Sequence, residues 1–173
     1  MKKIIFLIIL LFYNTTSHAN KIVYLDVQYI IDNSNLGIFY KNKIKIQQDK
    51  NVSKLKIKEN EIEKTELEIK NKKNILSEDE IKKYINELND LVKSYQLNRN
   101  EFNKNIIESK KEYTSKILSI LNPLLTNYVD ENEIIIVLDK KSILVGIKSL
   151  DITPAILKLL NEDVEKKNLI NEN

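Results

Sequence analysis

The side chains that could carry chemistry are of few kinds in this 173-residue chain. Its single histidine is His18 and it contains no cysteine, so the residues after position 19 offer neither an imidazole nor a thiol. The usual zinc ligands, thiol nucleophiles and histidine general bases are therefore excluded from that part. Neither of the two glycines, Gly37 and Gly146, is followed by lysine, so no phosphate-binding loop is built. We expect no metal and no cofactor.

Carboxylates are abundant, but they alternate with lysines along helical stretches, which is typical of solvated helix faces. An enzyme would have to work with Asp, Glu, Lys, Tyr and Ser alone. The sequence therefore predicts a binding or structural protein and not an enzyme.

The first nineteen residues have the layout of a secretory signal peptide. Lys2 and Lys3 precede the apolar run 4–13, and residues 17–19 form a small-x-small cleavage site. An uncleaved anchor is the alternative, although this run is shorter than the roughly 20 apolar residues that span a bilayer. Without the two lysines, 26 basic residues face 25 acidic ones, so the charge gives no indication of a nucleic-acid partner.

Residues 34–121 contain no proline and one glycine and are rich in Lys, Glu, Asn, Ile and Leu, which predicts long charged helix. The second half has apolar residues at alternating spacings of four and three, which is typical of a coiled-coil seam. Its apolar positions are Ile81, Ile85, Leu88, Val92, Tyr95, Phe102, Ile106, Tyr113, Ile117, Ile120 and Leu124. The first half has one strong apolar position per heptad, so we expect it to need the second half as a partner.

A helix start interrupts this stretch. Ser77 is a good N-cap, Glu80 completes a capping box, and Leu76 and Ile81 occupy the positions of a hydrophobic staple. One continuous helix is the alternative, because a cap contributes only about 1 kcal/mol. We expect a helical hairpin arm over residues 34–121 with its tip near 76–79.

The two ends of the chain predict a small second body. Residues 21–27 indicate a strand, Pro123 should close the return arm, and residues 133–147 indicate two strands joined by a turn at 139–142. A last helix should begin with Thr153 as its N-cap and Pro154 in the first position. Residues 20–33 and 122–173 would then form a β-rich oligomerisation body, which makes the fold class α+β.

Exposed strand edges of such a body invite pairing between subunits. Apolar strand residues are therefore the candidates for its core and its subunit interface. They are Ile22, Val23, Leu25, Ile134, Ile136, Leu138, Ile143 and Val145.

Several segments together resemble the Skp/OmpH family of periplasmic chaperones. They are "KIVYLDVQYIIDNSNLG" after the signal peptide, the long charged hairpin, "IVLDKKSILVG" and the closing "SLDITPAILKLLN". The most specific parts are Asp26 to Gln28 and Asp151 to Thr153. The resemblance covers essentially the whole chain after residue 19.

The resemblance implies a homotrimer in which the bodies form one central barrel-like unit and three arms surround a cavity. There the family holds unfolded outer-membrane proteins in the periplasm without ATP. One departure is the nearly neutral charge, since family members are often strongly basic. Contact of the arm tips with a membrane surface would be weak, because Lys70, Lys72 and Lys73 are followed by acidic residues 78–80.

Apolar residues off the predicted seam are the candidates for contacts with an unfolded chain, although several could pack inside the hairpin instead. They are Ile57, Leu67, Tyr84, Leu91, Leu97 and Ile107. The alternative function is a structural coiled-coil adaptor of the cell envelope that binds one folded partner. The breadth of clients separates the two, because many weak contacts suit unfolded chains of any sequence.

Overall fold

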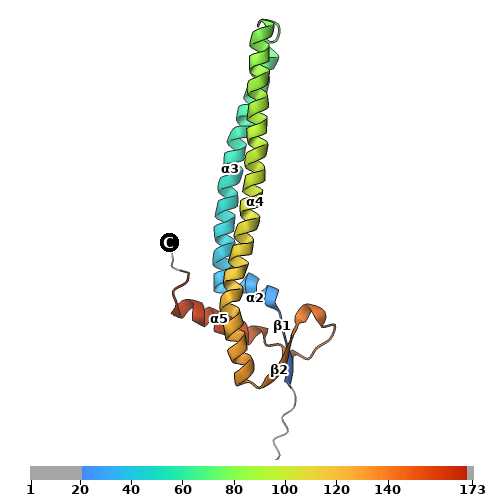
Figure 1. The fold of residues 1–173 in the computed structure, drawn as a ribbon, viewed down its shortest axis with the longest axis vertical. Coiled ribbons are helices and arrows are strands. Elements are labelled where there is room, and N and C mark those ends of the chain that lie inside the picture. The colour runs from blue at the N-terminus through green and yellow to red at the C-terminus, as the bar shows by residue number, and fades with distance from the viewer. Residues whose placement is uncertain (1–20, 171–173) are drawn as a thin grey trace, which may run out of the picture.

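Two long antiparallel helices form an arm that stands on a small body (Figure 1). The computed structural model describes residues 21–170, and the expected signal peptide lies outside them. In chain order the elements are β1 Lys21–Leu25, α2 Val27–Asn33, α3 Asn35–Lys72, α4 Glu78–Glu131, β2 Ile134–Asp139, the 3-10 turns η1 Lys140–Ser142 and η2 Lys148–Leu150, and α5 Thr153–Lys166. The predicted hairpin is confirmed: α3 and α4 are separate helices joined by residues 73–77.

The predicted capping box at the tip is confirmed. The backbone N–H of Glu80 donates to Ser77 Oγ at 3.4 Å, and Glu80 Oε2 accepts from the backbone N–H of Ser77 at 2.9 Å. The side chain of each residue thus accepts a hydrogen bond from the backbone N–H of the other at the start of α4. The hydrogen bonds from Ser77 also lower the pKa of Glu80 below its ordinary value.

The seam of α4 differs in part from the predicted one. The half-buried positions follow spacings of three and four as Ile81, Tyr84, Leu88, Leu91, Tyr95, Asn98, Phe102, Asn105 and Ser109. Ile85 and Arg99 are exposed, whereas Val92 and Ile106 remain half-buried at the edge of the contact. Sequence apolarity favoured Ile85 and Ile106, but the direction in which α3 packs brings asparagines into the interface.

Helix α4 continues through Pro123 to Glu131, so the prediction that Pro123 closes the return arm is wrong. A proline inside a helix removes one hydrogen bond and disfavours the preceding turn. Beyond it, the helix packs Leu124, Leu125, Tyr128 and Val129 against the core of the body. Burial of these side chains offsets the loss at Pro123.

The sheet has two parallel strands, β1 and β2, and not the three strands predicted. The segment after β2 forms η1, an extended loop and η2, so the predicted second strand over 143–147 is wrong for this chain. A strand requires a neighbour to pair with. In the described chain β1 has β2 on one side and only a bridge from Tyr24 to Asp151 on the other, which leaves residues 143–147 without one.

The hydrophobic core lies where β1, α2 and α5 meet the lower ends of the two arm helices. Its buried side chains are Val23, Leu25, Ile30, Leu36, Ile117, Leu121, Ile134, Ile152, Ile156, Leu160 and Val164. The body is therefore mainly helical with a small sheet, and the arm is rooted in it through both of its helices. The helix α5 begins one residue earlier than predicted: its N-cap is Ile152 and not Thr153, which places Pro154 in the second position of the first turn and not in the first.

Candidate binding arm and assembly surface

Polar pairs connect the two helices of the arm along much of its length. Tyr95 Oη donates to Glu59 Oε1 at 2.7 Å, and Lys58 Nζ donates to Ser94 Oγ at 3.1 Å. Near the tip, Lys72 Nζ donates to Tyr84 Oη at 3.2 Å. Nearer the body, Ser109 Oγ donates to Gln47 Oε1 at 3.4 Å, and the rings of Tyr40 and Tyr113 are stacked with centroids 4.2 Å apart.

These contacts give the arm an interface that is less apolar than a usual coiled-coil seam. The hydrogen bond from Tyr95 is the main cause of a lowered pKa of Glu59, and the same bond raises the pKa of Tyr95. Solvated polar pairs add little stability compared with buried apolar ones. The outer arm is therefore held together weakly relative to its length of about 57 Å, at 1.5 Å per residue over the 38 residues of α3.

Four of the six candidate client-contact residues are exposed. Ile57, Leu67, Leu97 and Ile107 each have more than half of their surface accessible. The pairs Lys58 with Ser94 and Glu59 with Tyr95 fix the antiparallel register, so Ile57 and Leu97 lie at similar heights on the arm.

The other two candidates, Tyr84 and Leu91, lie in the seam and not off it. Tyr84 is half-buried, and Lys72 Nζ lies 5.1 Å from the centroid of its ring. Leu91 is half-buried as well. These two side chains therefore belong to the contact between α3 and α4.

The sequence interpretation missed other exposed apolar side chains on the arm. They are Ile38, Ile46, Val52, Ile75 and Ile85. Ile85 was assigned to the seam, and the rest belong to the half of the hairpin with the weaker pattern. A helical-wheel comparison of the two halves in antiparallel register would have found them.

The lysines near the tip differ in their surroundings. Lys70 and Lys73 are exposed, whereas Lys72 contacts Glu68 Oε2 at 3.6 Å in addition to Tyr84. The hydrogen bond to Tyr84 is the main cause of a raised pKa of Lys72. Among the described residues, no helix is at once long and apolar enough to cross a membrane.

The structure divides the oligomerisation candidates into two groups. Val23, Leu25 and Ile134 are buried in the core of their own subunit. The remaining five are accessible: Ile22, Ile136, Leu138 and Val145 are exposed and Ile143 is half-buried.

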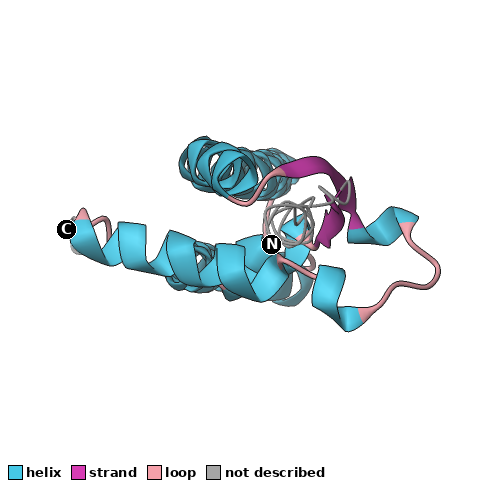
Figure 2. Ribbon diagram, turned by 90° about the horizontal axis from the view of Figure 1, so that it is seen from below, coloured by secondary structure: helices cyan, strands magenta, loops and turns pink. Residues whose placement is uncertain are grey.

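The sequence interpretation missed Ile135, Leu144 and Ile147, which are also exposed. They belong to the same apolar run, "EIIIVLDKKSILVGI", as the predicted candidates. Figure 2 shows that the segment with η1 and η2 projects from the body on the side opposite the far end of α5. Exposed apolar side chains therefore occur both on β2 and in the loop that follows it.

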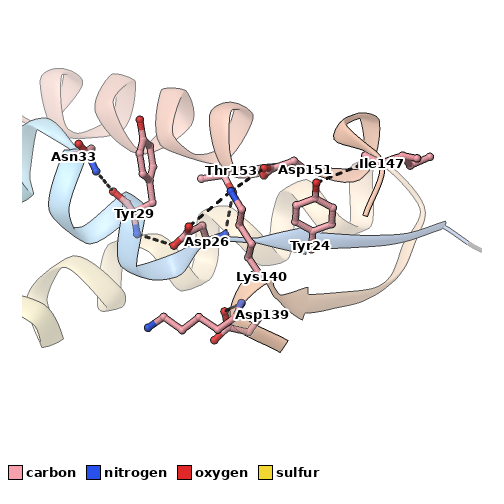
Figure 3. A network of polar contacts seen from close by, with 10 residues as sticks. Tyr24, Asp26, Tyr29, Asn33, Asp139, Lys140, Ile147, Asp151 and Thr153 are labelled. Carbon is pink, nitrogen blue, oxygen red and sulfur yellow. Dashed lines mark hydrogen bonds and ion pairs between the residues drawn. The ribbon is translucent and has the colours of Figure 1, made fainter. Parts of the chain in front are cut away.

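A network of polar contacts joins the two most specific segments of the sequence, Asp26–Gln28 and Asp151–Thr153 (Figure 3). The backbone N–H of Asp26 donates to Thr153 Oγ1 at 2.9 Å. Lys140 Nζ lies 3.3 Å from Asp151 Oδ2 and 3.8 Å from Asp26 Oδ2. The hydrogen bond with Asp151 is the main cause of a raised pKa of Lys140.

The two aspartates of this network also shape their own backbone. Asp26 Oδ1 accepts from the N–H of Tyr29 and caps α2, and Asp151 Oδ1 accepts from the N–H of Thr153 at the start of α5. Burial opposes the ionisation of Asp151, but the hydrogen bonds from Thr153 and Lys140 outweigh it and lower the pKa of this carboxyl. Sequence comparison could single out these aspartates, but only the fold shows that they share one lysine.

Comparison with known proteins finds a family and a solved structure that are similar to this chain. The family model for outer membrane proteins of the OmpH-like type matches residues 21–160. A crystal structure from Caulobacter crescentus, of a candidate outer membrane chaperone of the OmpH-like type, is similar with a TM-score of 0.78. The two sequences are 14% identical, and the match covers 85% of this chain and 87% of the other. A search of curated proteins gave no match.

The matched region contains β1, the whole arm, β2 and most of α5. The expected resemblance to the Skp/OmpH family is therefore confirmed over the arm and the body together, and not over the charged hairpin alone. The chain belongs to the OmpH-like family of outer membrane proteins.

Proposed function

We propose that this protein is an ATP-independent holdase chaperone of the periplasm that binds unfolded outer-membrane proteins between its helical arms. Its membership of the OmpH-like family supports a chaperone role. The observation that carries the proposal is the set of large apolar side chains left exposed along a charged, slender arm. A single exposed apolar residue is ordinary, but several of them along one slender arm offer many weak contacts, which suit clients of varied sequence.

The spacing of these residues suits an extended client. Ile107 lies near the base, Ile57 and Leu97 lie near the middle, and Leu67 lies nearer the tip. Ile57 and Leu67 are ten positions apart on one helix, which corresponds to about 15 Å along the arm. An unfolded chain can contact several such points at once, whereas each point binds only weakly, so the client is held without a fixed sequence.

We further propose that three copies assemble through their bodies, so that the arms enclose a cavity. Support comes from the apolar surface of β2 and the following loop, which is larger than the body can bury within one chain. The open edge of β2 adds backbone groups that a second copy could pair with. In the assembly, the predicted strand over residues 143–147 would gain the neighbour that it lacks among the described residues of one chain.

The test is light scattering as a urea-unfolded outer-membrane barrel protein is diluted into buffer, with and without the chain from residue 20 onward and without nucleotide. A holdase suppresses scattering at near-stoichiometric concentration. The same experiment with several unrelated barrel proteins measures the breadth of clients.

Unchanged scattering by a folded chain would overturn the proposal and favour the envelope adaptor. In that case, one folded partner should be retained by the arm in a binding experiment. Suppression for a single barrel protein only would likewise contradict a general holdase.

A further inference from the structure

We propose that Lys140 is a positioning residue for assembly: its contacts with Asp151 and Asp26 close the loop 140–151 and hold its apolar tip in place for a second copy of this chain. The inference rests on the proposed assembly through the bodies. The charged contacts of Lys140 with Asp151 and Asp26 lie outside the apolar contact between copies, and they hold the loop in the conformation that makes this contact.

The loop is closed at its base by Lys140 and Asp151. Their 3.3 Å contact joins two residues eleven positions apart, one directly after β2 and one directly before α5. Asp26, which follows β1, adds a second carboxylate at 3.8 Å. The lysine therefore connects the two ends of the loop with the end of β1, which is distant from both in sequence (Figure 3).

The inner side of the loop rests on Tyr24 of β1. Tyr24 Oη donates to the carbonyl oxygen of Ile147 at 3.3 Å. A Cβ placed on Gly146 would lie 3.0 Å from Cε1 of the Tyr24 ring, so the backbone passes close to the aromatic face. Together with Lys140 at the base, this contact fixes which side of the loop faces outward.

The outward side is apolar, and no part of the chain between residues 21 and 170 covers it. Leu144 is fully exposed and Val145 is 93% exposed, and Ile147 is exposed beside them. Ordering such a loop before binding lowers the entropy that association costs. A second copy is the fitting occupant, because β2 leads directly into the loop, carries the exposed Ile136 and Leu138, and has one edge without a neighbour among the described residues.

Sedimentation velocity over a range of concentrations tests this role. The chain from residue 20 onward is compared with its Lys140→Gln and Lys140→Arg variants. An exposed ion pair changes an equilibrium by up to about fivefold, so an effect of about threefold at each of three loops gives on the order of thirtyfold in the dissociation constant of a trimer. Lys140→Gln should show this increase, and Lys140→Arg should restore most of the affinity.

Lys141→Gln is the matched control. Lys141 is exposed and adjacent, but it is the backbone N–H of this residue that donates to Asp139. Its replacement should leave assembly unchanged. Circular dichroism of each variant establishes whether the helical fold is retained.

Salt dependence of the unmodified chain provides a second measurement. Raising sodium chloride from about 0.05 to about 0.5 M should weaken its assembly toward that of Lys140→Gln, because added ions screen solvent-accessible charges. The Lys140→Gln variant should respond less. The salt response of the unmodified chain is informative even if the variant unfolds, because its absence alone contradicts the positioning role.

Equal assembly of Lys140→Gln and the unmodified chain would overturn the positioning role. So would an unmodified chain whose assembly does not respond to salt. A chain that sediments as a monomer throughout would instead contradict the proposed assembly, and that result appears without any variant.

Discussion

Gly37 lies where α2 turns into α3, at the root of the arm. A Cβ at this position would overlap the carbonyl oxygen of Ile31 in the backbone of α2, and it would lie 3.0 Å from Ser34 Oγ. The backbone N–H of Gly37 also donates to that hydroxyl at 3.1 Å. The absence of a side chain therefore allows the two helices to cross closely and directs α3 away from the body.

Replacement of Gly37 by alanine should lower the free energy of unfolding by at least about 2 kcal/mol, since backbone atoms would have to move to accept the methyl group. Urea unfolding followed by circular dichroism measures this effect. Asn42→Ala, an exposed change on α3, is the control. Equal stability of the two variants would show that the crossing can relax without cost.

Asp151 should contribute to the dependence of stability on pH. Its pKa is lower in the folded chain than the ordinary value of 3.8. The stabilisation from this group is thus present above that value and is lost as the pH falls through the folded pKa. Asp151→Asn should be less stable than the unmodified chain near neutral pH, and the difference should decrease below about pH 4.

Urea unfolding between about pH 7 and about pH 3 measures this difference. Asp79→Asn, an exposed change in the first turn of α4, is the control. A constant difference across the whole range would contradict a stabilising role of the Asp151 charge.

At the scale of elements, the cap at Ser77 separates the two helices of the arm. Ser77→Ala should destabilise the first turn of α4 by about 1 kcal/mol, because one backbone N–H loses its hydrogen-bond acceptor. Hydrogen exchange of the amides at 78–84 should accelerate by about fivefold, while the base of the arm stays unchanged. Ser115→Ala, an exposed change farther along α4, should leave these amides unaffected. Unchanged exchange at 78–84 in Ser77→Ala would show that the turn forms without the cap.

The polar seam makes the arm adaptable at some cost in stability. Asn98 and Asn105 occupy half-buried positions that a regular coiled coil fills with apolar side chains. Replacing both by leucine should stabilise the arm by about 1 kcal/mol for each residue through added apolar burial. Thermal unfolding and hydrogen exchange measure the gain, and Asn103→Leu on the exposed side is the control. A loss of stability would show that the asparagines make hydrogen bonds the arm requires.

At the scale of the whole molecule, client holding and assembly should be separable because they use different parts of the chain. Serine at the four exposed client-contact candidates, Ile57, Leu67, Leu97 and Ile107, should weaken client holding. A total loss of only about 1 kcal/mol in the free energy of client binding raises the dissociation constant about fivefold. About five times more chaperone is then needed for the same suppression of scattering. The sedimentation behaviour should stay unchanged.

The matched control for this variant replaces four exposed polar residues of the arm by serine. They are Lys64, Asn71, Asn103 and Lys111. Full suppression of scattering by the variant with serine at Ile57, Leu67, Leu97 and Ile107 would show that these four residues are not part of the binding surface. Dissociation of the assembly would assign them to subunit contacts instead.

The sequence by itself determined the hairpin and the composition of its faces. The local signals were sufficient there, because the capping box at Ser77 and the heptad spacing after Ile81 act between residues close in the chain. The local sequence does not decide which of two neighbouring positions of α4 faces α3. It depends on the side from which α3 approaches, which no local pattern specifies.

The tertiary structure decided the course of the body. Pro123 is accepted inside α4 because the following turns bury apolar side chains in the core, and the apolar run 143–147 stays a loop because no strand neighbours it within one chain. Lys140 carries no recognisable motif, yet the fold brings Asp26 and Asp151 to it from opposite ends of the chain. Contacts of such long range depend on how the elements pack, so they follow from the folded chain and not from its local sequence.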